Sequence, residues 1–376
     1  MSADTATAGG EDLRFMELAL TLGRRGLGRT WPNPSVGAVL VRRHADGGRI
    51  VGRGWTQPGG RPHAETQALQ RAGGAARGST LYVTLEPCSH HGQTPPCADA
   101  LIAAGIAEVV SALEDPNPQV AGEGHRRLAA AGIAVKVGIG AATACRDHAG
   151  HIWRMRAGRP HVTLKLAVSA DGKAGLADRR PAAISGEQAR ARVHLMRAMH
   201  DAVLTGIGTV LADDPLLTCR LPGMADRSPV RIVLDSSLRI GFDTRLVATA
   251  RETPLWIVAS EAAAPDRVQA LQARGVEVLR AGLHNGKLDL EGALKQISGR
   301  GITRVMVEAG PILAAAMLEA DLVDAAALVH SRRVIGPDGI DALEGLPLAA
   351  LTRSPRLELI RTEGLGEDTI ELLGRR

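Results

Sequence analysis

The sequence predicts an α/β protein built from two domains in succession. Short apolar runs alternate with helical stretches along most of the chain, and this alternation is typical of a sheet with helices packed on its faces. This alternation of helices and strands is interrupted once, near residues 140–160, which suggests a boundary between domains. In addition, a chain of 376 residues is too long for one simple core. Apolar residues make up 45% of the chain and charged residues 23%, which is typical of a globular protein.

The first domain is expected to follow ten small and polar residues that lack structure. A helix is predicted over 12–27, because apolar residues recur there at helical spacing. Two apolar runs, 36–41 and 49–54, are separated by a glycine pair at 47–48, which indicates a β-hairpin. Helices and strands then alternate: helix 64–72, strand 80–85, helix 98–104, strand 108–112, helix 122–131 and strand 134–137.

The break between the domains falls in an arginine-rich stretch, 146–160, that lacks clear periodicity and ends in a proline. We therefore expect one domain over 11–150 and a second over 158–376. Seven apolar runs predict the strands of the second domain, with helices between most of them: 161–168, 201–205, 230–234, 255–259, 276–279, 303–307 and 325–330.

The composition argues against several classes of protein. The net charge of +5 suits phosphorylated small molecules, whereas nucleic acid is not expected as a partner, because aromatic residues for stacking bases make up only 2%. No segment resembles a secretory signal, and no apolar run is long enough to span a membrane. Four cysteines are too few for a disulfide framework. We expect a cytoplasmic protein that forms a homo-oligomer.

A candidate zinc site is the most informative feature of the first domain. His63, Cys88 and Cys97 can supply one imidazole and two thiolates to Zn²⁺, leaving the fourth position open for water, as a catalytic site requires. Glu65 follows the histidine by two residues and is suited to carry protons for that water. These residue types predict hydrolytic removal of an amino group. A structural zinc, closed by His90 or His91 as the fourth ligand, is the alternative.

The second domain contains weaker signals for a nucleotide. The segment from Gly206 to Thr209 is glycine-rich but lacks the third glycine of a dinucleotide fingerprint. In the segment 304–317 an apolar strand leads through Gly310 and Pro311 into a helix, whose N-terminus offers backbone N–H groups to a phosphate. A plain strand–turn–helix explains this spacing equally well.

Several segments together resemble the bacterial deaminase/reductase family of riboflavin biosynthesis. In the first domain they are 32–39, 62–65, 84–97 and 114–124, and in the second 164–175, 205–220, 231–236 and 307–311. The eight residues between Cys88 and Cys97, which include paired histidines, are characteristic of this family. The resemblance implies a cytidine-deaminase-like α/β/α domain followed by a dihydrofolate-reductase-like α/β domain that uses NADPH.

The same resemblance implies roles for individual residues. His63, Cys88 and Cys97 match the zinc ligands, Glu65 matches the catalytic proton carrier, and Asn33 would contact the pyrimidine. The residues that would line the NADPH site are Ala167, Thr209, Asp213, Ser236, Gly310, Pro311, Ile312, Leu313, Ala314, Ala315 and Ala316. Those that would meet the phosphorylated substrate are Arg197, Leu217, Arg220 and Glu308. Lys165 and Asp171 are further polar candidates near the reacting sugar.

The chain departs from the family pattern at two places. Ala183 stands where a tryptophan that contacts the cofactor is usual. His148–His151 replaces a common asparagine-lysine-glycine-phenylalanine sequence. Two other functions remain open at this point: a tRNA or nucleoside deaminase with an unrelated C-terminal domain, and a nucleotide-binding protein in which zinc is structural.

Overall fold

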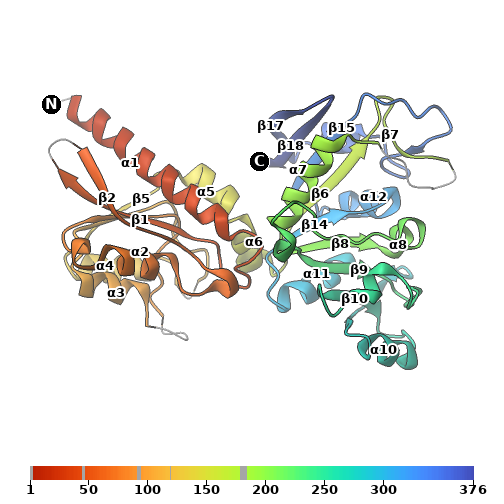
Figure 1. The fold of residues 1–376 in the computed structure, drawn as a ribbon, viewed down its shortest axis with the longest axis horizontal. Helices are drawn as coiled ribbons and strands as arrows, with labels where there is room; N and C mark the ends of the chain where they lie inside the picture. Colours follow the sequence, from red (N-terminus) through yellow and green to blue (C-terminus); the bar gives the residue numbers. More distant parts are fainter. Residues whose placement is uncertain (1–2, 45–46, 91–94, 119, 178–183) are drawn as a thin grey trace. The chain divides into compact units, whose positions relative to one another are not determined.

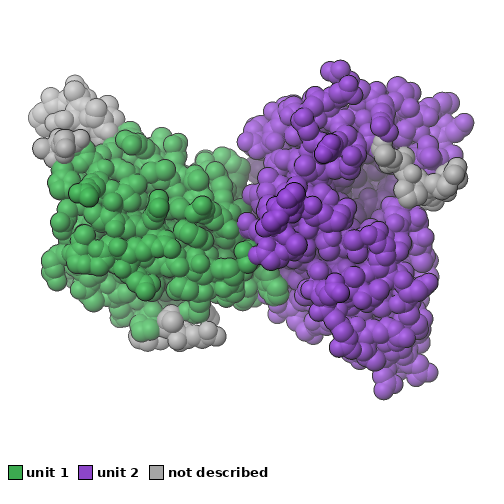
Figure 2. Space-filling model, viewed as in Figure 1, with its two compact units in different colours: residues 1–158 green, residues 159–376 purple. Residues whose placement is uncertain are grey.

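The structure, a computed structural model, divides the chain into two compact units, Met1–Gly158 and Arg159–Arg376, drawn in green and purple in Figure 2. The residues that it describes are 3–44, 47–90, 95–118, 120–177 and 184–376. Ala183, where the cofactor-contacting tryptophan is missing, lies outside these residues, as does His91.

The first unit contains a five-stranded sheet in the order β2-β1-β3-β4-β5 (Figure 1). β1 is antiparallel to both of its neighbours, β2 and β3, whereas β3, β4 and β5 are parallel to one another. The loops that leave β2, β3 and β4 therefore emerge at the same edge of the sheet. The strands are β1 (Gly37–His44), β2 (Gly47–Trp55), β3 (Thr80–Val83), β4 (Glu108–Ser111) and β5 (Ala134–Val137).

Helices cover both faces of this sheet. Ala38 and Leu40 of β1 pack in a core with α2, α3 and α4, whereas Val39 and Val41 pack in a second core with α1 and α5. This alternation along one strand confirms the α/β/α architecture expected for the first domain. The helices are α1 (Ala3–Gly23), α2 (Ala64–Ala72), α3 (Cys97–Ala104), α4 (Glu123–Ala130), α5 (Ala141–Asp147), α6 (Ala149–Ala157) and the 3₁₀ turns η1 (Arg24–Gly26), η2 (Pro58–Gly60) and η3 (Gly73–Ala76).

The second unit contains a nine-stranded sheet in the order β11-β10-β9-β8-β14-β6-β15-β18-β17 (Figure 1). The strands from β11 to β15 in this order are parallel, and the hairpin of β17 and β18 adds two antiparallel strands at one side. The strands are β6 (His161–Val168), β8 (Ala202–Gly206), β9 (Val230–Leu234), β10 (Leu255–Ser260), β11 (Glu277–Ala281), β14 (Arg304–Glu308), β15 (Ala325–His330), β17 (Leu357–Leu365) and β18 (Asp368–Arg375).

Both faces of the second sheet are buried at its central parallel strands. On one face Val233, Ile257 and Met306 pack in a core with helices α7 to α10, and strand residues of the opposite face, such as Ile232 and Val305, are fully buried too. The helices are α7 (Glu187–Ala198), α8 (Ile207–Asp213), α9 (Arg245–Ala248), α10 (Pro265–Gln272), α11 (Leu290–Gly299), α12 (Pro311–Glu319), α13 (Ala349–Thr352) and the 3₁₀ turn η4 (Ala225–Arg227). Two small ribbons pair β7 (Lys173–Gly175) with β16 (Ile340–Asp341) and β12 (Leu283–His284) with β13 (Lys287–Leu288).

The structure corrects the expectations for the N-terminal segment and the hairpin. α1 begins at Ala3, so most of the ten residues expected to lack structure are helical, in keeping with the high helix propensity of their alanines. α1 ends at Gly23, before the predicted limit of 27. Gly47 and Gly48 pair with His44 and Arg43, so the glycine pair belongs to β2 and not to the turn.

Two further elements were not foreseen. The stretch expected to be irregular forms α5 and α6, and the side chains that α6 buries include His151, whose polarity hides the helical period. The hairpin of β17 and β18 was missed because β17 is the outer strand of the sheet and exposes apolar residues such as Leu359 and Ile360, which blurs the alternation.

Candidate active sites

His63, Cys88 and Cys97 come together at the edge of the first sheet where β2 and β3 end. The ligand atoms of the three residues all lie within 4.8 Å of one another. The Nδ1 atom of His63 is 3.7 Å from the Sγ of Cys88 and 3.4 Å from the Sγ of Cys97. Tetrahedral bonds from zinc to nitrogen and sulfur place such atoms about 3.6 Å apart. The distances from the His63 nitrogen to both sulfurs therefore fit a shared zinc ion.

The local backbone explains how residues distant in the sequence converge. His63 is the extended residue that precedes α2, and Cys97 is the first residue of α3. The loop after β3 carries Cys88 to the same point, where its carbonyl accepts a hydrogen bond from the N–H of Ala98 at 3.1 Å. The Sγ of Cys88 accepts another from the N–H of Cys97 at 3.3 Å. Both sulfurs thus lie at a helix N-terminus, which favours a thiolate at Cys88, whereas the hydrogen bond with Cys88 raises the pKa of the Cys97 thiol.

No fourth protein ligand joins this cluster among the described residues. His90 is exposed and is absent from the group of ligand atoms. The other candidate for closing the site, His91, lies outside the described part of the chain. The described geometry is that of an open site with three protein ligands, which is the arrangement of catalytic zinc.

Glu65 lies in the first turn of α2 and is only 4% exposed. Burial raises the pKa of its carboxyl group to about 7, and the negative charge of Cys88 acts in the same direction. A hydrogen bond with Cys97 lowers the pKa of the Cys88 thiol to about 4. A carboxyl group that titrates near neutrality beside a metal cluster is suited to take up and release a proton.

Glu86 is a buried residue of this region that the sequence did not single out. Both of its carboxylate oxygens accept backbone hydrogen bonds from the loop before α4 and from the first turn of α4. The donors are the N–H groups of Asp115 (3.0 Å), Gly122 (2.9 Å), Gly124 (2.7 Å) and His125 (3.3 Å). Glu86 and His125 also belong to a second cluster of possible metal ligands with Glu114. Because its oxygens are occupied by these donors, we assign Glu86 to holding the loop.

Asn33 also lies at this edge, in the loop that precedes β1. Its side-chain amide donates to the carbonyl of Gly60 at 3.4 Å. A Cβ atom on Gly60, whose φ is +84°, would lie 2.0 Å from the Asn33 amide nitrogen. Only glycine therefore permits this approach, which fixes the half-buried Asn33 in place.

In the second unit, four residues expected at the NADPH site lie at the carboxyl edge of adjacent parallel strands. Ala167 is near the end of β6, Thr209 is in α8 just after β8, Ser236 follows β9, and Gly310 follows β14. The Thr209 hydroxyl accepts a hydrogen bond from the N–H of Gly310 at 3.1 Å. Ligands of open α/β sheets bind at this edge.

The other residues expected to contact NADPH differ in accessibility. Gly310 is the extended residue before α12, and Pro311 begins that helix. Ile312 is 55% exposed, whereas Ala314 and Ala315 are buried in the core. Leu313 and Ala316 are half-buried, and Asp213 is exposed at the end of α8. A phosphate at the start of α12 would therefore meet backbone N–H groups rather than the alanine side chains.

Arg197 and Glu308, both expected to meet the substrate, form an ion pair with each other. The Arg197 Nε and Nη2 atoms donate to the two Glu308 oxygens at 2.6 and 2.9 Å, and Nη1 donates to the carbonyl of Thr218 at 3.0 Å. Leu217 is buried in the core. Arg220 is exposed. Of the two arginines expected to grip a phosphate, Arg220 is the one with its charge open to solvent.

Lys165 and Asp171 have different surroundings. Lys165 lies opposite Glu308 in the pairing of β6 with β14, and burial lowers the pKa of its ammonium group. Asp171 accepts hydrogen bonds from the Ser169 hydroxyl and from the N–H groups of Ile335 and Gly336. Asp171 thus joins two loops, whereas Lys165 extends the charged cluster of Arg197 and Glu308.

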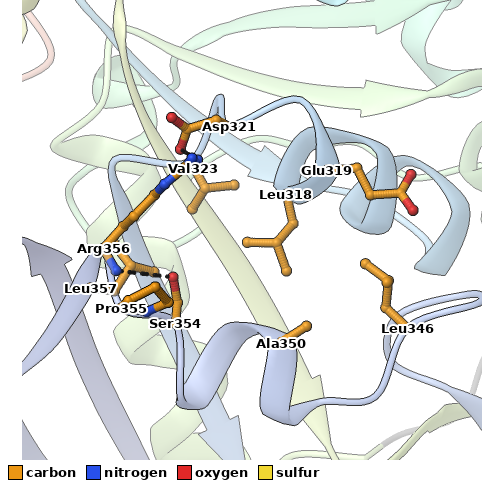
Figure 3. A pocket seen from close by; sticks show the side chains of 10 residues that line it. All are labelled: Leu318, Glu319, Asp321, Val323, Leu346, Ala350, Ser354, Pro355, Arg356 and Leu357. Atoms are coloured by element: carbon orange, nitrogen blue, oxygen red, sulfur yellow. Dashed lines mark hydrogen bonds and ion pairs between the residues drawn. The ribbon is translucent and has the colours of Figure 1, made fainter.

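A hollow of about 340 Å³ lies elsewhere in the second unit, at the C-terminal end of α12 (Figure 3). Leu318, Val323 and Leu346 are among the aliphatic residues that line it, and the ion pair of Asp321 with Arg356 closes one side. Because α12 starts at the carboxyl edge of the sheet, its C-terminal end lies at the opposite edge. This hollow is therefore separate from the candidate reductase site.

Comparisons with known proteins identify the family of each unit. Residues 160–370 match the model of the RibD C-terminal domain, and residues 10–113 match the cytidine and deoxycytidylate deaminase zinc-binding region. The riboflavin biosynthesis protein RibD of Escherichia coli is 42% identical, over 97% of this chain and 100% of the relative. The chain belongs to the RibD family. The RibD of Mycobacterium tuberculosis is 37% identical, over 94% of this chain and 95% of that protein.

Solved structures of RibD proteins have the same fold. Acinetobacter baumannii RibD superposes with a TM-score of 0.85 at 34% identity, covering 98% of this chain and 99% of that one. The deaminase/reductase of Thermotoga maritima gives a TM-score of 0.83 at 34% identity, covering 98% and 100%. As a RibD protein, the chain is a bifunctional deaminase and reductase of riboflavin biosynthesis, with zinc and NADPH as cofactors. None of the described helices has both the length and the apolar character needed to cross a membrane.

Proposed function

We propose that the two units catalyse consecutive reactions on one phosphorylated pyrimidine. A deaminase domain over 11–150 would convert 2,5-diamino-6-(5-phosphoribosylamino)pyrimidin-4-one into 5-amino-6-(5-phosphoribosylamino)uracil. A reductase domain over 158–376 would then reduce the ribosyl group of that product to ribityl. The observation that carries the proposal is the cluster of one imidazole and two sulfurs beside the buried carboxyl group of Glu65.

In the deaminase reaction, His63, Cys88 and Cys97 hold zinc. The chemistry that zinc supplies when bound is the activation of water at neutral pH. Glu65 accepts a proton from the attacking water and delivers it to the departing amino group, so that the C–N bond breaks and ammonia leaves. Its pKa of about 7 matches both halves of this proton transfer. Asn33, held against Gly60, contacts the pyrimidine ring.

In the reductase reaction, the residues at the carboxyl edge of β6, β8, β9 and β14 hold NADPH, with a phosphate at the start of α12. The chemistry that NADPH supplies is a hydride, which goes to the ribosyl carbon bonded to nitrogen. The C–O bond of the sugar ring breaks, and the ring oxygen takes a proton. Arg220 binds the substrate phosphate, and the pair of Arg197 and Glu308 orients the sugar, with Leu217 supporting this wall from the core.

The proposal extends to partners and compartment. A small phosphorylated pyrimidine accounts for the basic net charge, so no nucleic-acid partner is needed. The zinc thiolates favour a reducing compartment, which supports action in the cytoplasm. A homo-oligomer is the expected assembly. The rival function, a tRNA or nucleoside deaminase, would leave the reductase unit without a role.

One assay tests the proposal. The zinc-loaded protein receives the pyrimidine phosphate and NADPH, and ammonia and NADPH absorbance are followed together. Ammonia release should precede NADPH oxidation. Glu65→Gln should abolish ammonia release and leave NADPH oxidation on the deaminated substrate intact, whereas Arg197→Ala should impair only the second step. Ammonia release from tRNA but not from the pyrimidine phosphate would refute the proposal, and so would equal loss of both steps in either variant.

A further inference from the structure

Helix α6 presents three polar side chains at intervals of three residues, starting from the residue before the helix. Residues spaced in this way lie on one face of a helix. Each contacts a different loop of the first unit: His148 Nε2 lies 3.0 Å from Thr84 Oγ1, His151 Nε2 lies 3.0 Å from Asp115 Oδ1, and Arg154 Nη1 lies 3.4 Å from the carbonyl oxygen of Pro32. One helix face thus contacts three loops.

These three loops all border the zinc cluster. Thr84 begins the loop that leads from β3 to Cys88, and Pro32 precedes Asn33 in the loop before β1. The loop that follows β4 contains Asp115, whose N–H donates to Glu86, two residues before Cys88. α6 therefore packs against the edge of the sheet that holds the candidate deaminase site.

The contact between His151 and Asp115 is the most buried ion pair of this helix. Their side chains are 9% and 13% exposed. Although burial opposes ionisation, the hydrogen bond from His151 and its charge lower the pKa of Asp115. Asp115 is thus a carboxylate, and the Nε2 of His151 carries the proton between them. Asp115 Oδ1 also accepts the N–H of Asn117 at 2.9 Å.

In the described part of the chain, one polar atom of this pair is buried without a partner, and another is open. His151 Nδ1 is a buried nitrogen without a partner among the described residues, whereas Asp115 Oδ2 accepts no hydrogen bond from them and does not belong to the buried unpaired atoms. Polar atoms in buried side chains are nearly always paired, so the open oxygen of Asp115, whose side chain is only 13% exposed, is suited to a ligand that bears hydrogen-bond donors. The amino groups and ribose hydroxyls of the proposed deaminase substrate are such donors.

We propose that His151 is a positioning residue of the deaminase site, which holds Asp115 so that its second oxygen accepts a donor group of the phosphorylated pyrimidine. Phenylalanine, the residue common here in the resembling family, can fill the same space but cannot donate to a carboxylate. The inference rests on the proposed deaminase function. It adds a specificity element on α6, outside the zinc ligands and Glu65.

The test measures ammonia release by zinc-loaded His151→Phe and His151→Gln variants of the full chain. His151→Phe should raise the KM of deamination about tenfold, which corresponds to about 1.4 kcal/mol, and change kcat little. His151→Gln, which retains a side-chain N–H donor, should restore most of the lost affinity. Zinc content and NADPH oxidation on deaminated substrate should stay at the wild-type level. Arg156→Gln, an exposed change on the same helix, is the matched control and should behave as wild type.

A double variant separates positioning from a structural role. Because His151 is inferred to act through Asp115, His151→Phe should add nothing to the KM of Asp115→Asn. An unchanged KM in His151→Phe would overturn the inference, as would a loss of kcat with unchanged KM, a loss of zinc, or full additivity with Asp115→Asn. If the wild-type protein itself releases no ammonia, the proposed function fails instead, and the two failures are thus distinguishable.

Discussion

Replacing Glu86 by glutamine should destabilise the first unit strongly, although it changes only one atom of a buried side chain. Each carboxylate oxygen of Glu86 accepts two backbone N–H groups. A side-chain NH₂ in place of either oxygen leaves two buried donors without an acceptor. Each orphaned donor costs about 1–3 kcal/mol, so the total loss is roughly 2–6 kcal/mol.

Calorimetric unfolding of the zinc-loaded protein measures this loss. For a unit of this size, about 1 kcal/mol lowers the Tm by roughly 2–4 °C, so the transition of the first unit should fall by at least about 4 °C. Ammonia release should decline more than NADPH oxidation, because Glu86 fixes the loop that carries Asp115. Glu123→Gln is the control, since the side chain of Glu123 is half exposed and, among the described residues, its carboxylate forms an ion pair with Arg126 alone. A Tm for Glu86→Gln equal to that of the control would refute the reasoning.

Three further changes have defined outcomes. Cys88→Ser should remove the one zinc per chain and all ammonia release while NADPH oxidation persists; metal analysis that still finds stoichiometric zinc would reject the ligand assignment. Burial raises the pKa of Glu308, but the charge of Arg197 outweighs this effect and lowers the pKa below its usual 4.5. The pair should therefore stabilise the second unit above that pH and cease to do so as the pH falls through the lowered pKa. The difference in unfolding free energy between wild type and Glu308→Gln should shrink as the pH falls from 7 toward 2, and a difference that stays constant or grows would contradict this sign. Asp324→Ala leaves the buried Arg159 without its bidentate partner and should cost about 3–5 kcal/mol in denaturant unfolding, whereas a loss below about 1 kcal/mol would contradict the pairing.

Most of the fold follows from patterns that the sequence displays directly. Strands that are buried on both faces, such as β6 and β9, read as continuous apolar runs, and their predicted bounds agree with the structure. α6 escaped prediction because its face toward the protein carries histidines in place of leucines. The side chains on this face form hydrogen bonds with polar loops and do not pack in an apolar core, so hydrophobic periodicity cannot detect the helix.

The sequence was sufficient to predict the zinc cluster. His63, Cys88 and Cys97 are residue types that bind zinc, and they lie at the ends of predicted helices and strands. The role of Glu86 could not be predicted, because a glutamate that accepts hydrogen bonds from backbone N–H groups looks like any other glutamate in a sequence. The pairing of Arg197 with Glu308 was also hidden, because it joins residues 111 positions apart. Contacts of this kind depend on strand order, which local patterns do not encode.

Both candidate sites share one physical principle. Each lies where parallel strands end, and each places key residues at the start of a helix: His63 before α2, Cys97 at the start of α3, and Gly310 before α12. Helix N-termini carry partial positive charge and unpaired N–H groups, which favour a thiolate at Cys88 in one site and would favour a phosphate in the proposed reductase site. Deamination and reduction therefore require different side chains, but both candidate sites use the N-terminus of a helix. The inferred positioning role of His151 does not follow this pattern. Its side chain comes from α6, a helix that follows another helix, α5, and not a strand.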